Sequence, residues 1–284
     1  MQQPRGFLSL VGAILTEPCS PEADYGVFYI DALTYQPMCG AGTLSVAKVL
    51  VETGMVKRVE PETKIVLETP TGLVTVYVKW ENHMVASINL ENVPAFLYRK
   101  ELHIDLAGYG DVSVDIGYGG NFFVLADVHS LGLTITKDTV NLLRSLSKDI
   151  LAAANKVIKV AHPTNPAINY LDQVLFCQNV PEEDGGYLAQ CIFGDAQADI
   201  SPCGTGTSTR LAQRYFRGLI GLEETFVQKS VCGGAFHAKG LRETTLGGVP
   251  AIVPYVSCSD VHITGFNHLI VEENDKLKNG FVSW

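Results

Sequence analysis

Ser201-Pro202-Cys203-Gly204-Thr205-Gly206-Thr207-Ser208-Thr209 is the stretch around which the rest of the chain is organised. Residues 210–216 extend this stretch as a helix-like run. The two glycines let the backbone turn tightly and approach a ligand. Thr205, Thr207 and Ser208 are natural capping residues for the helix. Cys203 is then expected just ahead of a helix N-terminus, where free amides and the helix dipole favour a thiolate and a bound carboxylate. One such turn is weak evidence by itself, because most cysteines are buried structural residues.

A second copy of the turn lies in the first half of the chain. It is Pro37-Met38-Cys39-Gly40-Ala41-Gly42-Thr43, and a helix-like run over residues 46–51 follows it. Both copies contain Cys-Gly-x-Gly-Thr, so two similar halves would place two thiols across a shared cleft. A thiol and a thiolate on opposite faces of a carbon atom are what a cofactor-free racemase needs, because one face loses a proton and the other gains one.

Composition restricts the class of protein. Of 284 residues, 46% are hydrophobic and 18% charged, which indicates a globular chain with a sizeable core. The net charge of −9 argues against nucleic acid or an anionic membrane as a partner. No apolar run approaches the ~18 residues of a membrane-spanning helix. Seven dispersed cysteines without a Cys-x-x-Cys pair favour a reducing compartment, so we expect a cytoplasmic protein.

Hydrophobic periodicity predicts many short strands and few long helices. One apolar stripe at helical spacing predicts a helix over residues 137–158. Alternation predicts strands over 7–15, 25–33, 64–69, 73–80, 84–90, 101–106, 112–118, 122–126, 173–177, 187–193, 225–231, 235–241 and 249–257. The order strands, helix, strands occurs twice and indicates an α+β fold of two similar lobes. Most connections are too short for crossovers, which argues against βαβ units.

With both cysteine turns placed, the chain resembles the proline racemase family, which includes hydroxyproline epimerases and hydroxyproline dehydratases. The resemblance extends over nearly the whole chain. It rests on Met38-Cys39-Gly40 and Ser201–Ser208, and on further stretches at 115–123, 198–199, 224–227, 265–267 and 278–281. It implies two pseudo-symmetric lobes, each a strand barrel around a central helix as in diaminopimelate epimerases, with the active site between them. We expect residues 1–128 plus about 262–284 to form the lobe of Cys39, and residues 129–261 the lobe of Cys203.

The resemblance also implies roles for individual residues. Cys39 and Cys203 would be the two acid/base thiols in racemisation or epimerisation of proline or 4-hydroxyproline, without pyridoxal phosphate or a metal. Asp199 would bind the ammonium group of the imino acid. The amides of four residues would bind its carboxylate, and two further residues would form the pocket wall: Gly40, Ala41, Gly204 and Thr205, then Gln173 and Val11. A homodimer is expected.

Three departures from the family keep alternatives open. Ala41 stands where the family usually has histidine, Ile200 stands where it usually has arginine, and members normally have a longer N-terminal segment. One alternative is a catalytically impaired paralogue that binds imino acids or only dimerises. The other is a trans-3-hydroxyproline dehydratase, which is disfavoured because family dehydratases have serine or threonine at the position of Cys39.

The remaining cysteines and the histidines are expected to have no chemical role. The seven histidines show no ligand spacing, so no metal site is predicted. We expect five cysteines to be structural: Cys19, Cys177, Cys191, Cys232 and Cys258. Both thiols of the paired turns are expected to have a pKa below the ~8.5 of a free cysteine, because each precedes a helix N-terminus.

Overall fold

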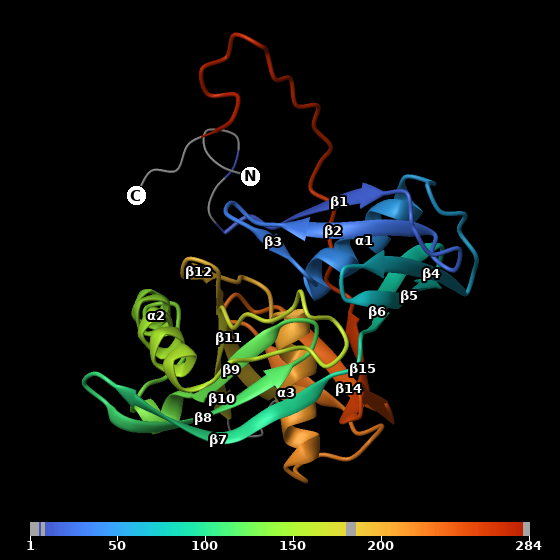
Figure 1. The fold of residues 1–284 in the computed structure, drawn as a ribbon. Coiled ribbons are helices and arrows are strands. Elements are labelled where there is room, and N and C mark those ends of the chain that lie inside the picture. Colours follow the sequence, from blue (N-terminus) through green and yellow to red (C-terminus); the bar gives the residue numbers. More distant parts are fainter. Residues whose placement is uncertain (1–5, 7–8, 180–185, 281–284) are drawn as a thin grey trace.

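A computed structural model describes residues 6, 9–179 and 186–280 (Figure 1). The helices are α1 (Gly40–Glu52), η1 (Val128–Leu131, a 3-10 helix), α2 (Val140–Val157) and α3 (Gly204–Phe216). The strands are β1 (Gly12–Thr16), β2 (Tyr25–Ile30), β3 (Tyr35–Gln36), β4 (Glu62–Thr69), β5 (Gly72–Glu81), β6 (Met84–Glu91), β7 (Phe96–Leu106), β8 (Gly110–Tyr118), β9 (Phe122–Asp127), β10 (Gln173–Asn179), β11 (Gly186–Phe193), β12 (Gln197–Ala198), β13 (Phe226–Lys229), β14 (Ala235–Leu246) and β15 (Val249–Cys258). Among the described helices, none combines the length and the apolar character needed to cross a membrane.

The strands form two lobes that share one hydrogen-bonded path. The order along it is β1-β2-β4-β5-β6-β15-β14-β13-β11-β10-β9-β8-β7, and β3 and β12 pair at its sides with β2 and β11. In the upper lobe of Figure 1 the strands β1, β5 and β6 contact α1, and in the lower lobe β7–β9, β14 and β15 contact α3. The α+β fold of two lobes, each with a central helix, is confirmed.

The two lobes repeat one connectivity. In the first lobe β1, β2, β3, α1, β4, β5 and β6 follow one another, and β10, β11, β12, α3, β13, β14 and β15 repeat that order and that pairing in the second. The Cys-Gly-x-Gly-Thr turn therefore occupies the same place in each repeat, directly before the central helix. In the described part of the chain, only the second lobe has the additional elements β7–β9 and α2.

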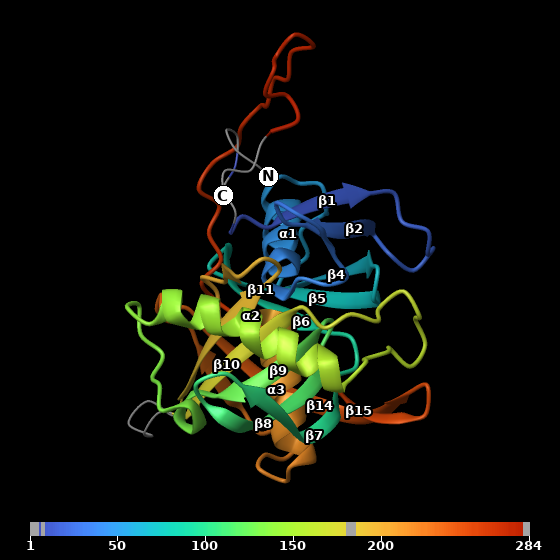
Figure 2. The same cartoon turned by 60° about the vertical axis from the view of Figure 1, so that its left-hand side comes forward.

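Parallel strand pairs occur where the sequence predicted none. β2 pairs with β4 across α1, β9 with β10 across α2, and β11 with β13 across α3. Most other neighbouring strands are antiparallel and joined by short turns, as expected. The expectation of no βαβ units is wrong at these three places, where a helix connects two parallel strands. Strands β9 and β10 are buried almost throughout because α3 contacts β9 on one side and α2 covers both on the other (Figure 2).

The boundary between the lobes differs from the predicted one. Strand β9 pairs in parallel with β10, and α3 packs on β7, β8 and β9. An isolated antiparallel β-bridge joins Ala95, directly before β7, to Ile252 in β15. This bridge connects the first and the last strand of the second lobe around α3. Residues 96–127 therefore belong with Cys203, and a division at residue 128 is wrong because it would cut this sheet. The change of lobe falls at residues 92–95. In the C-terminal segment, Leu269, Val271 and residues 278–280 line a cavity together with the β2–β3 turn of the first lobe.

Candidate active site

Both paired-turn cysteines are N-cap residues of the central helices. The Sγ atom of Cys39 accepts a hydrogen bond from the Gly42 amide at 3.3 Å, and Sγ of Cys203 accepts one from the Gly206 amide at 3.3 Å. The expected caps Thr205, Thr207 and Ser208 instead lie inside α3, so the thiols themselves do the capping. Each sulfur is thus held where the positive end of a helix dipole stabilises negative charge.

The glycines of the motif let the two helix starts meet. A methyl group on Gly40 would lie 2.7 Å from the Cα atom of Gly204, and one on Gly204 would lie 2.7 Å from the Cα atom of Gly40. The second glycine of the motif has a different reason to be glycine. A methyl group on Gly42 or Gly206 would lie 3.2 or 3.0 Å from the sulfur that its own amide contacts.

The backbone differs at the two cysteines. Cys39 is extended, with φ −138° and ψ 107°, whereas Cys203 has φ 64° and ψ 100°. A side chain in this left-handed region is strained and needs support from its surroundings. Ser201 Oγ accepts a hydrogen bond from the Cys203 amide at 3.0 Å, and Gln228 Nε2 donates to the Pro202 carbonyl at 2.7 Å. Gln228 was not singled out in the sequence, because it lies 25 residues beyond Cys203 on β13.

A cavity of about 30 Å³ lies between the two helix starts. All eight residues proposed for the site line it, and Val11 lies there too: Cys39, Gly40, Ala41, Gln173, Asp199, Cys203, Gly204 and Thr205. Four further lining residues were missed in the sequence: Gln36, Met38, Cys191 and Phe193. Gln36 could have been suspected only through its turn, where its Nε2 atom donates to Asp31 Oδ2 at 3.1 Å.

Asp199 is a half-buried carboxylate, and no basic side chain among the described residues is paired with it. Its Oδ1 atom accepts a hydrogen bond from the Ser201 amide at 2.8 Å. Burial raises its pKa, against the opposing effect of the Ser201 hydrogen bonds. None of the cavity-lining residues in the described part of the chain is lysine, arginine or histidine. Ile200 points into solvent, with 73% of its surface exposed. The Asp199 carboxylate can therefore pair with a cationic group of a ligand that enters the cavity.

The thiol of Cys39 does not have the expected low pKa. Burial raises its pKa to about 12, although the Gly42 amide opposes that shift, and the nearby Asp199 and Cys203 raise it further. The expectation from helix N-termini is therefore wrong for Cys39, because in so small a cavity the loss of water outweighs the helix amides. Near neutral pH Cys39 is a thiol.

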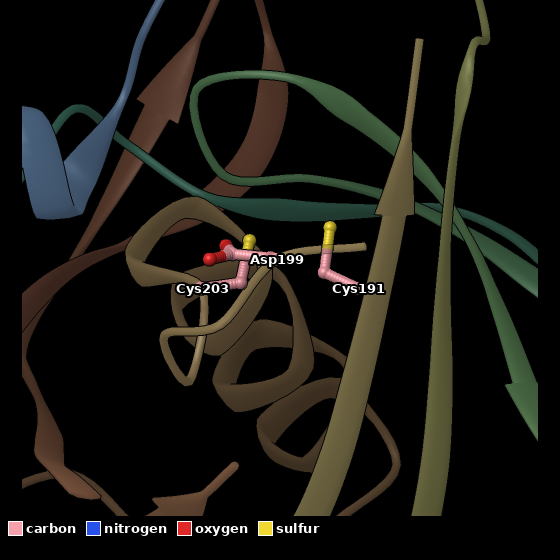
Figure 3. Close-up of side chains that lie close together, drawn as sticks. All are labelled: Cys191, Asp199 and Cys203. Carbon is pink, nitrogen blue, oxygen red and sulfur yellow. The ribbon is translucent and has the colours of Figure 1, made fainter. Parts of the chain in front are cut away.

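Cys191 lies beside Cys203 and Asp199 rather than in a remote core. Figure 3 shows the three side chains together, with Cys191 on a strand of the second lobe and Cys203 at the start of a helix. Their ligand atoms all lie within 4.8 Å of one another. Hydrogen bonding toward Cys203 and burial raise the pKa of the Cys191 thiol. The prediction that Cys191 is purely structural missed this contact, because strand pairing brings residue 191 back to residue 199.

One buried amide connects the two lobes at the cavity. Asn121, in the turn between β8 and β9, donates from Nδ2 to the Met38 carbonyl at 2.8 Å and lies 3.4 Å from Thr205 Oγ1. The adjacent Gly120 has φ 114°, and a methyl group on it would lie 2.8 Å from Met38. This turn therefore fixes the residue before Cys39 against the start of α3.

Comparison with known proteins agrees with this geometry. The family model described as proline racemase matches residues 1–282. The proline racemase of Clostridioides difficile is 37% identical over 282 residues, which cover 99% of this chain and 84% of that protein. The trans-3-hydroxy-L-proline dehydratase of Burkholderia cenocepacia is 38% identical over 283 residues, with the same two coverages of 99% and 84%.

A solved structure is also similar over the whole fold. It is a hydroxyproline epimerase from Agrobacterium vitis with bound trans-4-hydroxy-L-proline, with a TM-score of 0.94 and 29% identity. The match covers 100% of this chain and 81% of that one. Because the family model and these relatives cover nearly the entire chain, the protein is an enzyme of the proline racemase family.

Proposed function

We propose that the protein inverts the α-carbon of proline or 4-hydroxyproline with two cysteine thiols and no cofactor. The observation that carries this proposal is that Cys39 and Cys203, one from each lobe, cap facing helices and line one cavity. A racemase that uses two bases needs acids and bases on opposite faces of one carbon atom. The internal repeat supports this proposal, because each lobe contributes a cysteine at the same place in the repeat.

The other lining residues fit an imino acid in one orientation. Amides at the first positions of a helix have no partner within the helix and favour an anion, so those of Gly40, Ala41, Gly204 and Thr205 suit the carboxylate. Asp199 suits the ring ammonium, since it is the one charged side chain among the described residues that line the cavity. The α-carbon then lies between the two sulfur atoms, and Gln173 and Val11 contact the ring.

The proton transfers follow from this placement. One sulfur, as thiolate, removes the α-proton, and the electron pair passes into the carboxylate, where the helix amides stabilise the added charge. The opposite sulfur, as thiol, delivers a proton to the other face, so the product has inverted configuration and the two sulfurs have exchanged protonation states. Because the pKa of Cys39 is raised to about 12, Cys39 begins as the proton donor.

Deuterium exchange tests the proposal directly. The full chain is incubated in D2O with L-proline or trans-4-hydroxy-L-proline, and α-deuterium incorporation and optical rotation are followed. Cys39→Ser and Cys203→Ser should each abolish inversion, while Cys177→Ser, at a buried cysteine outside the cavity, should retain it. Inversion that survives both active-site substitutions would exclude the two-thiol mechanism. Comparison of the two substrates decides between racemase and epimerase.

Dehydration of trans-3-hydroxyproline is the second candidate activity. The relative from Burkholderia cenocepacia that carries this name is as similar to the chain as the racemase. Cys39 argues against it, because a cysteine at this position supplies the second acid/base that inversion requires and elimination does not. Release of water from trans-3-hydroxy-L-proline without α-inversion of proline would favour this activity. Calorimetry with pyrrole-2-carboxylate, a planar mimic of the deprotonated carbon, tests whether the cavity binds imino acids at all.

Two further expectations concern the protein's surroundings. All seven cysteines are unpaired, which supports a reducing compartment and hence a cytoplasmic location. A homodimer remains a prediction, and light scattering coupled to size-exclusion chromatography measures it.

A further inference from the structure

We propose that Cys191, Asp199 and Cys203 form a binding site for a soft divalent cation, with Zn²⁺ as the reference ion. Two sulfur atoms and one carboxylate oxygen lie within 4.8 Å of one another, so a point exists that is at most about 2.8 Å from all three. Zinc binds cysteine sulfur at about 2.3 Å and carboxylate oxygen at about 2.0–2.2 Å. Shifts of roughly half an ångström would therefore bring these three atoms into the first coordination sphere of one ion.

The ligands are held in place by the backbone around them. The pairing of β11 with β12 returns the chain beside Cys191, and the Asp199 amide donates to the Cys191 carbonyl at 3.0 Å. Gln190 Nε2 donates to the carbonyls of both Cys191 and Asp199, at 3.0 and 2.8 Å. Ser201 links the remaining two ligands, through its amide to Asp199 and through its hydroxyl to the Cys203 amide. Such outer hydrogen bonds orient metal ligands and strengthen binding.

The donor set selects the class of ion. Thiolates prefer zinc and other soft or borderline cations over Mg²⁺ and Ca²⁺, which prefer oxygen. The two cysteines are buried, and the described wall of the cavity has no basic side chain to balance negative charge. A divalent cation compensates two thiolates, whose protons leave to solvent when the ion binds. The adjoining cavity of about 30 Å³ leaves room for a water molecule as the fourth ligand.

The proposed metal site shares two of its three residues with the proposed catalytic site. Cys203 and Asp199 are shared, whereas Cys39 is outside the group of three. A bound ion would therefore block the base and the ammonium site together. Inhibition by zinc rests on the proposed function, but zinc binding does not.

Calorimetry and spectroscopy on the metal-free full chain test the proposal. Zn²⁺ titration should show one site with proton release, and Co²⁺ should give a tetrahedral spectrum with thiolate charge-transfer bands. Cys191→Ala should weaken Zn²⁺ binding by about 100-fold or more. Cys177→Ala, a buried cysteine on the neighbouring strand β10, should leave the affinity unchanged and is the matched control. Equal affinity in the wild type and in Cys191→Ala would overturn the site.

Two further measurements test the metal site even if Cys191→Ala folds poorly. X-ray absorption on the zinc-loaded wild type should show two sulfur atoms at about 2.3 Å, and a shell of only oxygen or nitrogen would refute the proposal. Cys39→Ser should lose α-carbon inversion yet retain zinc binding. Retained zinc binding together with unaltered inversion in Cys39→Ser would contradict the proposed function while leaving the metal site intact.

Discussion

The two cysteines occupy equivalent places in the repeat but are not equivalent residues. Cys39 has ordinary extended backbone, whereas Cys203 has φ 64° and is held by Ser201 and Gln228. Cys203 also has a third thiol, that of Cys191, beside it. A two-base racemase requires one sulfur to begin with a proton and the other without. The asymmetry of the surroundings allows the two thiols to start in different protonation states even though the helices around them are alike.

Alkylation of Cys39 should depend steeply on pH. Burial raises its pKa to about 12, so the reactive thiolate is scarce at neutral pH and increases as pH rises toward that value. Iodoacetamide labelling of the native protein at a series of pH values, followed by mass spectrometry of peptides, measures this. Cys39 should be labelled several-fold faster for each unit of pH, until the protein unfolds.

Exposed cysteines provide the internal reference for that experiment. Cys19 and Cys232 are exposed and should be labelled faster than Cys39 at neutral pH. Pyrrole-2-carboxylate should protect Cys39 and Cys203 but neither of the exposed pair. If Cys39 were labelled at neutral pH as fast as Cys19, its thiol would have no raised pKa.

The contact between the starts of α1 and α3 is the main constraint at the scale of elements. Gly204→Ala gains helix propensity, worth up to about 1 kcal/mol. The new methyl group would lie 2.7 Å from the Cα atom of Gly40, which is backbone and cannot rotate away. Overpacking of this kind costs about 1–3 kcal/mol, so the clash outweighs the gain and the free energy of unfolding should fall.

Urea unfolding of the variant measures this change. Gly221→Ala is the matched control, because the nearest atom to its added methyl group is Glu224 Oε2 at 3.7 Å, an ordinary contact. The control should remain within about 0.5 kcal/mol of the wild type. A Gly204→Ala variant as stable as the wild type would show that the helix starts can separate without cost.

Much of the fold was accessible from the sequence because its elements are strongly periodic. A stripe of seven apolar residues predicts the helix over α2: Val140, Leu142, Leu143, Leu146, Ile150, Leu151 and Ala154. Four of them are buried (Leu143, Leu146, Ile150 and Ala154), whereas Leu142 is exposed. The alternation in β4 and β5 likewise predicts strands that each bury one face. The partners of strands are not encoded locally, so the parallel pair of β9 and β10 and the lobe boundary near residue 95 could not be predicted in the same way.

The candidate site was predictable only where a motif marked it. The doubled Cys-Gly-x-Gly-Thr pattern identifies both thiols, and the Gly40–Gly204 contact explains why its first glycine cannot be alanine. Cys191 carries no local signal, and Asn121 lies in the family-like stretch 115–123 with nothing in the sequence to indicate its contact. Tertiary structure brings Cys191 to the cavity through the pairing of β11 with β12. It brings Asn121 to the lining residue Met38 through a hydrogen bond across the lobes.

At the scale of the whole molecule, the cavity must enlarge to admit a substrate. About 30 Å³ is room for little more than one water molecule, and an imino acid is several times larger. The lobes remain connected on one side through the pairing of β6 with β15. At the cavity they are connected by the hydrogen bond from Asn121 to the Met38 carbonyl and by the contact of Gly40 with Gly204. Separation of the lobes at the cavity, with β6 and β15 as the hinge, is the motion that this arrangement permits.

Asn121→Ala should therefore change rates more than affinity. Loss of a hydrogen bond worth about 1 kcal/mol raises the population of the open form roughly fivefold. Because binding and release both require opening, the association and dissociation rates of pyrrole-2-carboxylate should each rise about fivefold, and their ratio should change little. Stopped-flow measurements give both rates. Asn155→Ala is the control, since Asn155 lies away from the hinge strands and donates only within the second lobe, to the Leu151 and Leu171 carbonyls. A loss of affinity with no change in the association rate would show instead that Asn121 supports the site without restraining the lobes.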